Sequence, residues 1–164
     1  MSEFFQRPVV CNTSPVISLS KAGLGHLFGK LFTKVLTTRK VVEELKAKEA
    51  GDAASIHEAL SAFEILPTPP LDLVLSTILD PGEASVLQLA KEHGISGVVL
   101  DERRGRHVAM DVFGLEVVGT CGLLLRAKKL SLISEVIAPL DLIIANGLFI
   151  SPRLRLQCLR LAGE

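Results

Sequence analysis

Apolar residues gather in five short runs along the chain, and each run is followed by polar or glycine residues. Short apolar runs bounded by turn-forming residues are typical of buried strands. We therefore predict five strands, at residues 8–11, 34–37, 63–66, 97–100 and 115–118.

Between these runs the apolar residues recur at three- and four-residue spacing, which is typical of helices with one buried face. The clearest helix follows Asp80 and Pro81 and stops at Gly94. Asp80 is a good N-cap residue and Pro81 is suited to a first helical turn. Other helices are predicted within residues 15–27, after residue 38, over 53–62 and 71–79, after residue 101 through 110, over 119–130, and over 134–146 and 152–161.

Strands that alternate with helices predict parallel pairing, because a parallel connection needs a crossover segment. We expect an α/β fold with three layers, in which helices flank a central parallel sheet of roughly five strands. A length of 164 residues with 48% hydrophobic residues suits one domain with a substantial core, so we expect a single domain over residues 1–164.

Composition narrows the location and the partners. The sequence has no charge-free apolar run of about 18 residues and no secretory signal pattern near its start, so we expect a cytoplasmic protein with no membrane partner. Cys11, Cys121 and Cys158 lack paired spacing and suit reduced thiols. The formal net charge is +0, so a nucleic-acid partner would need a local basic patch.

Polar residues stand where the predicted strands end. Asn12, Asp101 and Thr120 lie at or just beyond the carboxyl ends of three strands, while Glu44 and Glu83 lie in early turns of helices. In a parallel sheet the carboxyl ends of the strands share one edge, where ligands bind. These five side chains are therefore expected to converge.

Carboxylates that converge repel one another unless a cation lies between them, and hard divalent cations prefer oxygen ligands. Mg²⁺ or Mn²⁺ fits this set, whereas none of the four histidines has a partner at the spacing of a zinc site. Carboxylate sites with one or two such ions commonly hydrolyse phosphodiesters. The pattern thus indicates a nuclease.

Each candidate also has a structural explanation. Asp101 can cap the helix that follows it, and Asn12 can cap its own helix. Glu83 in a first helical turn is favoured by the helix dipole. Glu43 and Glu44 can be solvated charges on an amphipathic helix. The expected convergence of these residues favours a site over any one of them taken singly.

Arginines follow Asp101 directly, at positions 103, 104 and 106. Arg103 and Arg106 suit bidentate contacts with phosphate, although salt bridges to nearby acids explain them equally well. Thr120 lies in a turn flanked by glycine, where its hydroxyl can hold a metal-bound water or a phosphate, or simply cap the turn.

Several segments together resemble a known family. The runs CNTSPVISLSKAG, KVVEEL, LDPGEASVLQLA and VVLDERRGRHVA are similar to PIN-like domains related to the toxins of prokaryotic toxin–antitoxin pairs. The resemblance covers nearly the whole chain. It implies a parallel sheet flanked by helices, an endoribonuclease site with Mg²⁺ or Mn²⁺ that acts on RNA, frequent homodimers, and often a small antitoxin partner.

The resemblance also assigns residues to the site. It implies metal-binding acids at Glu44, Glu83 and Asp101, and it aligns Asn12 with an aspartate of the family pattern. A carboxamide keeps an oxygen but loses the charge, so metal affinity should fall. Two hypotheses follow: a metal-dependent endoribonuclease in which Asn12 orients the ion or its water, or a nucleic-acid-binding or regulatory module that has lost strong metal binding.

Overall fold

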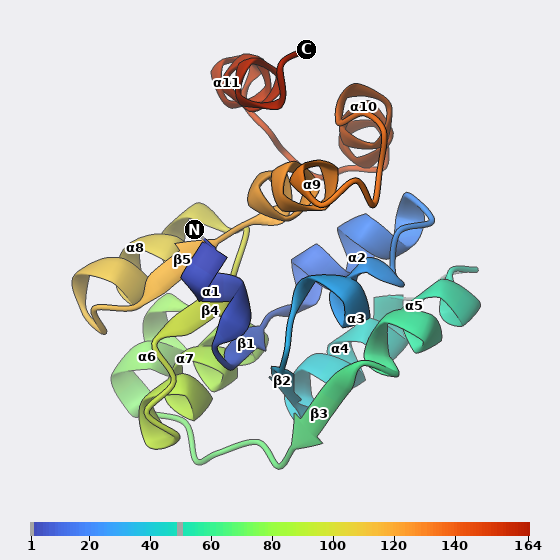
Figure 1. The fold of residues 1–164 in the computed structure, drawn as a ribbon. Helices are drawn as coiled ribbons and strands as arrows, with labels where there is room; N and C mark the ends of the chain where they lie inside the picture. The colour runs from blue at the N-terminus through green and yellow to red at the C-terminus, as the bar shows by residue number, and fades with distance from the viewer. Residues whose placement is uncertain (1, 49–50) are drawn as a thin grey trace.

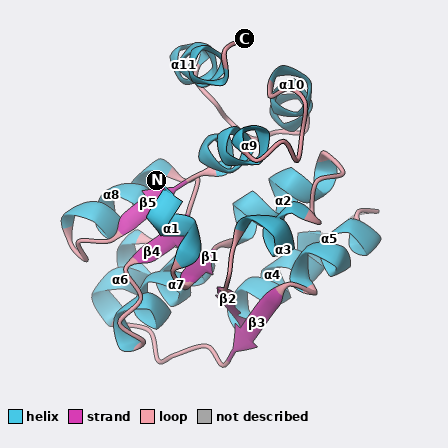
Figure 2. Cartoon of the chain, viewed as in Figure 1, coloured by secondary structure: helices cyan, strands magenta, loops and turns pink. Residues whose placement is uncertain are grey.

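A computed structural model describes residues 2–48 and 51–164. Five strands form one sheet in the order β3-β2-β1-β4-β5, and every neighbouring pair is parallel (Figure 2). The strands are β1 (Val9–Cys11), β2 (Val35–Thr38), β3 (Phe63–Leu66), β4 (Gly97–Val99) and β5 (Glu116–Val118). The predicted parallel sheet of five strands is confirmed.

Helices cover both faces of this sheet, as a three-layer α/β fold requires. In chain order they are α1 (Ser2–Gln6), α2 (Thr13–Lys21), α3 (Leu27–Leu31), α4 (Arg39–Lys48), α5 (Ala53–Leu60), α6 (Leu73–Ile78), α7 (Pro81–Glu92), α8 (Arg103–Asp111), α9 (Thr120–Lys129), α10 (Ile137–Ala145) and α11 (Pro152–Ala162). Helix α7 packs against β1, β2 and β4. Figure 1 shows α6 and α7 on one side of the sheet and α3 and α9 on the other.

The middle strands are buried on both faces, which explains why they are continuous apolar runs. All residues of β1 and β4 are buried, whereas the edge strands β3 and β5 are partly exposed. Helix α1 was not expected from the pattern, because it has only five residues. Its Phe4 and Phe5 are buried in the core, so packing rather than helical spacing holds it in place.

The strand register brings the polar strand ends together. Cys11 pairs with Val99, and Val99 pairs with Val118. The residues that follow these three therefore leave the sheet side by side, at the edge where α2, α8 and α9 begin. This register is what places Asn12 next to the segment around Asp101.

The last three helices form a unit beyond this part of the sheet (Figure 1). Helix α11 packs against α9, and α10 packs against α2. The connection between α10 and α11 returns to the sheet edge, where residues 147–150 line hollows beside the strand ends. No helix within the described ranges has the length and apolar character needed to cross a membrane.

Candidate functional site

Asn12 lies at the centre of the sheet edge, directly after β1. Its backbone N–H donates to the Val99 carbonyl at 3.0 Å, and its side chain is only 2% exposed. The side chain makes no capping hydrogen bond to α2. Its Nδ2 instead donates to Glu102 Oε2 at 3.4 Å, while its buried Oδ1 has no hydrogen-bond partner. Asn12 therefore faces Glu102 and presents a free acceptor oxygen.

Glu102 is the acid that contacts Asn12, and the sequence pattern did not single it out. Its other oxygen accepts a hydrogen bond from the Ser14 hydroxyl. Glu102 has an extended backbone and precedes α8. Side chains alternate in direction along extended backbone, so two adjacent residues face opposite ways. That alternation is the signal that could have identified Glu102, once the partner of Asp101 was known.

Asp101 points to the neighbouring strand end instead. Its Oδ1 accepts from the Thr120 backbone N–H and its Oδ2 accepts from the Thr120 hydroxyl, both at 2.7 Å. Gly119 allows this approach, because a Cβ at that position would lie 2.8 Å from Asp101 Oδ1. Burial raises the pKa of the Asp101 carboxyl, and the hydrogen bonds from Thr120 partly offset that rise. Asp101 thus joins β4 to the start of α9, and it does not cap α8.

Thr120 is fully buried, so its hydroxyl serves Asp101 within the protein. Arg106 is held at the same place, because its Nη1 donates to the Leu100 carbonyl at 2.8 Å. Arg103 is exposed, and Arg104 donates to the Ile78 carbonyl at 3.4 Å. Of the three arginines after Asp101, Arg103 has the greatest freedom to reach a phosphate.

Glu83 forms a capping box at the start of α7. Its backbone N–H donates to Asp80 Oδ1 at 2.8 Å, and its Oε2 accepts from the Asp80 backbone N–H at 3.3 Å. The residue is 5% exposed, and its Oε1 is buried with no hydrogen-bond partner. Burial, followed by the negative charges of Asp80 and Glu102, raises the pKa of the Glu83 carboxyl to about 7. The capping box therefore uses only Oε2 of the Glu83 carboxylate and leaves Oε1 free.

Glycine makes room for the free oxygen of Glu83. A Cβ at Gly105, in the first turn of α8, would lie only 2.6 Å from Glu83 Oε1. The carboxylate of Glu83 therefore reaches across from α7 to the helix that Glu102 precedes. This geometry explains why Glu102 contributes to the raised pKa of Glu83.

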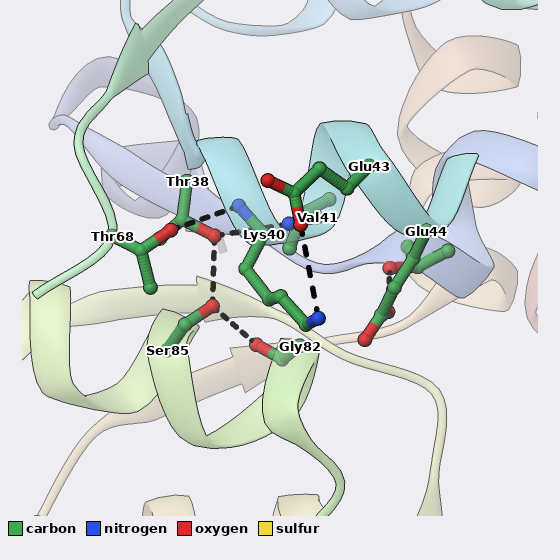
Figure 3. Close-up of polar contacts among 9 residues, drawn as sticks. Thr38, Lys40, Val41, Glu43, Glu44, Thr68, Gly82 and Ser85 are labelled. Carbon is green, nitrogen blue, oxygen red and sulfur yellow. Dashed lines mark hydrogen bonds and ion pairs between the residues drawn. The ribbon is translucent and has the colours of Figure 1, made fainter. Parts of the chain in front are cut away.

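Glu44 approaches the start of α7 from α4. Its Oε2 accepts from the Thr13 hydroxyl at 2.8 Å, and its Oε1 would lie 2.8 Å from a Cβ at Gly82. Figure 3 shows Glu44 reaching from α4 beside Gly82, while Glu43 forms an ion pair with Lys40 at 3.7 Å. The two adjacent glutamates therefore differ: Glu43 is exposed, and Glu44 faces the helix starts.

Helix α4 is positioned by a second hydrogen-bonded contact with α7. The Thr38 hydroxyl accepts from the Val41 backbone N–H at 3.1 Å and contacts the Ser85 hydroxyl at 2.7 Å (Figure 3). Thr38 thus caps α4, and it also connects that helix to α7. Both hydroxyls are buried, so the contact fixes the helix that carries Glu44.

An open cleft of about 720 Å³ adjoins the acids. Its lining combines carboxylates, arginines and apolar side chains, namely Ser14, Asp101, Glu102, Arg103, Arg106, His107, Met110, Gly147, Leu148, Phe149, Ser151 and Leu154. A mixed lining of this kind can take a ligand that has both anionic and apolar parts. Its volume is within the range of small-molecule and nucleotide sites.

The residues suited to a hard cation are Asn12, Glu83 and Glu102. Buried polar atoms are nearly always paired, so a cation would satisfy the unpaired Asn12 Oδ1 and Glu83 Oε1, whereas an added proton would satisfy the Glu83 oxygen alone. In the described part of the chain, no three His, Cys, Asp or Glu side chains lie close enough together to hold an ion. Asn12 lies outside those four residue types: its Nδ2 contacts Glu102, and its Oδ1 is a further oxygen at this edge.

Known proteins that resemble this chain include a solved structure and a sequence family. The crystal structure of PAE2754 from Pyrobaculum aerophilum is 19% identical with a TM-score of 0.48, covering 75% of this chain and 90% of that chain. No curated protein matches the chain. A family model described as a PIN domain matches residues 8–164. The chain therefore belongs to the PIN domain family.

Proposed function

We propose that this protein is an endoribonuclease that depends on Mg²⁺ or Mn²⁺. PIN domains are usually nucleases, and they generally use divalent metal ions. The observation that carries the proposal is the pair of buried, unpartnered oxygens, Asn12 Oδ1 and Glu83 Oε1. Asn12 contacts Glu102 through its Nδ2, and Glu83 Oε1 lies beside Gly105 in the helix that Glu102 precedes.

A divalent ion would supply a water of lowered pKa and would offset the developing charge on the phosphate. Glu83 and Glu102 provide the negative charge that holds such an ion, and Asn12 adds a neutral oxygen. The sequence also predicts Asp101 and Glu44 as metal ligands. Asp101 directly precedes Glu102 in the chain, and the Glu44 carboxylate lies beside Gly82, which directly precedes Glu83. Arg103, which is exposed on the cleft, is suited to contact the phosphate of the RNA.

The test is cleavage of a labelled single-stranded RNA in Mn²⁺, using native protein and the isosteric variants Glu83→Gln and Glu102→Gln. We expect cleavage that a chelator abolishes and that each variant loses by two orders of magnitude or more, because charged ligands are replaced by neutral ones. The predicted role of Asp101 is tested in parallel by Asp101→Ala. Cleavage that survives in all three variants would show that the acids are not the catalytic site.

A second candidate function rests on Asn12, which stands where the family pattern has an acid. Under this candidate the protein binds nucleic acid or regulates without strong metal binding. It predicts no measurable heat on titration of native protein with Mn²⁺, and a clear heat in Asn12→Asp. Tight Mn²⁺ binding by native protein would exclude this candidate in favour of the nuclease.

We further propose, from the family resemblance, that the protein forms homodimers and serves as the toxin of a toxin–antitoxin pair. Light scattering on the purified chain tests the first statement, with a mass of twice 17.6 kDa expected. The second predicts a small neighbouring gene whose product binds the chain on co-expression and suppresses RNA cleavage. Cleavage that is unchanged in such a complex would oppose the toxin role.

A further inference from the structure

Phe149 is an aromatic side chain in an unusual place, because its ring is 89% exposed. The chain has seven Phe and neither Trp nor Tyr, and all seven lie within the described ranges. Four of the others are buried, and the remaining two pack against the core. Phe149 is therefore the one Phe of the described structure that is largely exposed to solvent.

The position of this ring links it to the acidic edge. Phe149 lies in the connection between α10 and α11, and it lines the same cleft as Asp101, Glu102 and Arg103. It also borders a second hollow of about 390 Å³, which reaches Gly119 at the start of α9. Phe149 thus shares this cleft with Asp101 and Glu102, two of the acids proposed for phosphodiester hydrolysis.

We propose that Phe149 is a stacking platform for an unpaired base of the RNA, which it holds beside the acids. This inference rests on the proposed nuclease function. The cleft lining offers a contact for each part of a nucleotide. A base can stack on the Phe149 ring, and a phosphate can accept hydrogen bonds from the exposed Arg103. In duplex RNA both faces of a base are covered by its neighbours. The platform therefore selects single-stranded segments.

A protein partner fits the same lining less well. Glu102 lines the same cleft as Phe149, so an apolar partner that filled the cleft would bury this acid along with the ring, and burying a charge is costly unless it is paired. A flexible single strand leaves water and cations at the acids. The mixture of acids, arginine and one ring thus favours a nucleotide over an apolar protein surface.

The first experiment measures tryptophan fluorescence, because the native chain has no Trp and an introduced Trp is then the only indole. Phe149→Trp in a Glu102→Gln background introduces the single indole of the protein, while the second substitution prevents cleavage. We expect its fluorescence to be quenched by a single-stranded RNA oligonucleotide and to be unaffected by the same sequence as a duplex. Val112→Trp in the same background is the control, since Val112 is 70% exposed and ends α8 at the opposite end from Glu102.

The second experiment measures affinity for the same oligonucleotide in the Glu102→Gln background. Phe149→Ala and Phe149→Leu should each weaken binding by between about five-fold and about a hundred-fold, whereas Phe149→Trp should keep it, because only the ring can stack. Equal binding by Phe149→Ala would overturn the platform. A Phe149→Leu variant that binds as well as native would also overturn it, because an apolar contact would then suffice.

Failure of the platform is distinguishable from failure of the proposed function. If native protein cleaves RNA and Phe149→Ala cleaves it with unchanged KM, the platform is wrong and the nuclease stands. If native protein neither binds nor cleaves any RNA, the proposed function fails and the inference fails with it. A change from dimer to monomer in Phe149→Ala would place the ring in a protein interface and would also overturn the proposal.

Discussion

Thr120 is the residue on which the orientation of Asp101 depends, because it donates hydrogen bonds to both carboxylate oxygens. Thr120→Val keeps the shape but leaves Asp101 Oδ2 without its donor. Hydrogen bonds to charged groups contribute about 1.5–3 kcal/mol, so we expect a loss of that order in the free energy of unfolding by urea. Thr120→Ser keeps the hydroxyl and should lose much less. A loss in Thr120→Ser as large as in Thr120→Val would show that the hydroxyl is not the group that supplies this stability.

Glu83 gives stability a dependence on pH. Its pKa is raised from 4.5 to about 7 in the folded protein, so between these values the folded state holds a proton that the unfolded state has released. The free energy of unfolding should therefore fall as pH rises from 4.5 to about 7, and then level off. Glu83→Gln keeps the capping box and should flatten this slope in urea unfolding from pH 4.5 to 8. An unchanged slope would contradict the raised pKa.

The same titration bears on metal binding. An ion held by Glu83 needs the ionised carboxylate, so Mn²⁺ binding at pH 6 should release a proton from Glu83. The measurement is calorimetry in buffers of different ionisation enthalpy. The observed heat should vary with the buffer at pH 6 and become nearly independent of it at pH 8. Heat that is independent of the buffer at both values would show that Glu83 does not change protonation on binding.

At the scale of elements, the acids are placed by the close approach of helix starts. Gly105→Ala should gain up to about 1 kcal/mol of helix propensity in α8, but its Cβ would meet Glu83 Oε1 at 2.6 Å. We expect near-native urea stability together with at least a ten-fold loss of RNA cleavage. Gly29→Ala in α3 is the matched control, because its Cβ meets only Ala62 at 3.3 Å, far along the chain from the acids. If the two variants cleave RNA at the same rate, the close approach of Gly105 to Glu83 is not needed for cleavage.

Much of this element structure could be predicted from the sequence. The middle strands are apolar runs because the middle of a parallel sheet is buried on both faces, and Thr38, which caps α4, is a residue type suited to an N-cap. Helix α1 could not be predicted, because Phe4 and Phe5 hold it through contacts distant in sequence. Local spacing carries no information about such contacts.

The site was predictable to the level of the sheet edge and no further. Strand ends and helix starts indicate Asn12, Glu44, Glu83 and the segment around Asp101. They do not show that Asp101 bonds to Thr120 while Glu102 meets Asn12, because that depends on which way each side chain faces. The exposure of Phe149 could not be predicted from the sequence either, since a Phe in an apolar segment is usually buried.

At the scale of the whole molecule, Glu164 connects the last three helices, because it follows α11 and accepts hydrogen bonds from α9 and from the start of α10. Its carboxylate accepts from the backbone N–H groups of Val136 and Ile137, at 2.7 and 2.8 Å, and from Lys128 Nζ at 2.6 Å. The hydrogen bond from Lys128, together with those from the start of α10, lowers the pKa of Glu164. Its contribution should therefore be present above the ordinary glutamate pKa and be lost as pH falls through the lowered value.

Glu164→Gln should accordingly loosen the start of α10. Amide hydrogen exchange at residues 136–140 should become faster in the variant at pH 7, while exchange in β1 and β4 stays unchanged. Glu135→Gln is the control, because Glu135 is exposed and lies beside the same helix start. Faster exchange throughout the sheet would mean that Glu164 supports the entire fold instead of the terminal unit.

The two walls of the cleft come from different parts of the chain. Ser14 and the acids Asp101 and Glu102 belong to the sheet edge, whereas Leu148 and Phe149 belong to the connection that follows α10. The side-chain hydrogen bonds of these two acids come from Thr120, Asn12 and Ser14, which lie outside that connection. Under the proposed function, substitutions in the connection between α10 and α11 should therefore change which RNA segment is bound, while the acids at the sheet edge keep their hydrogen-bond partners.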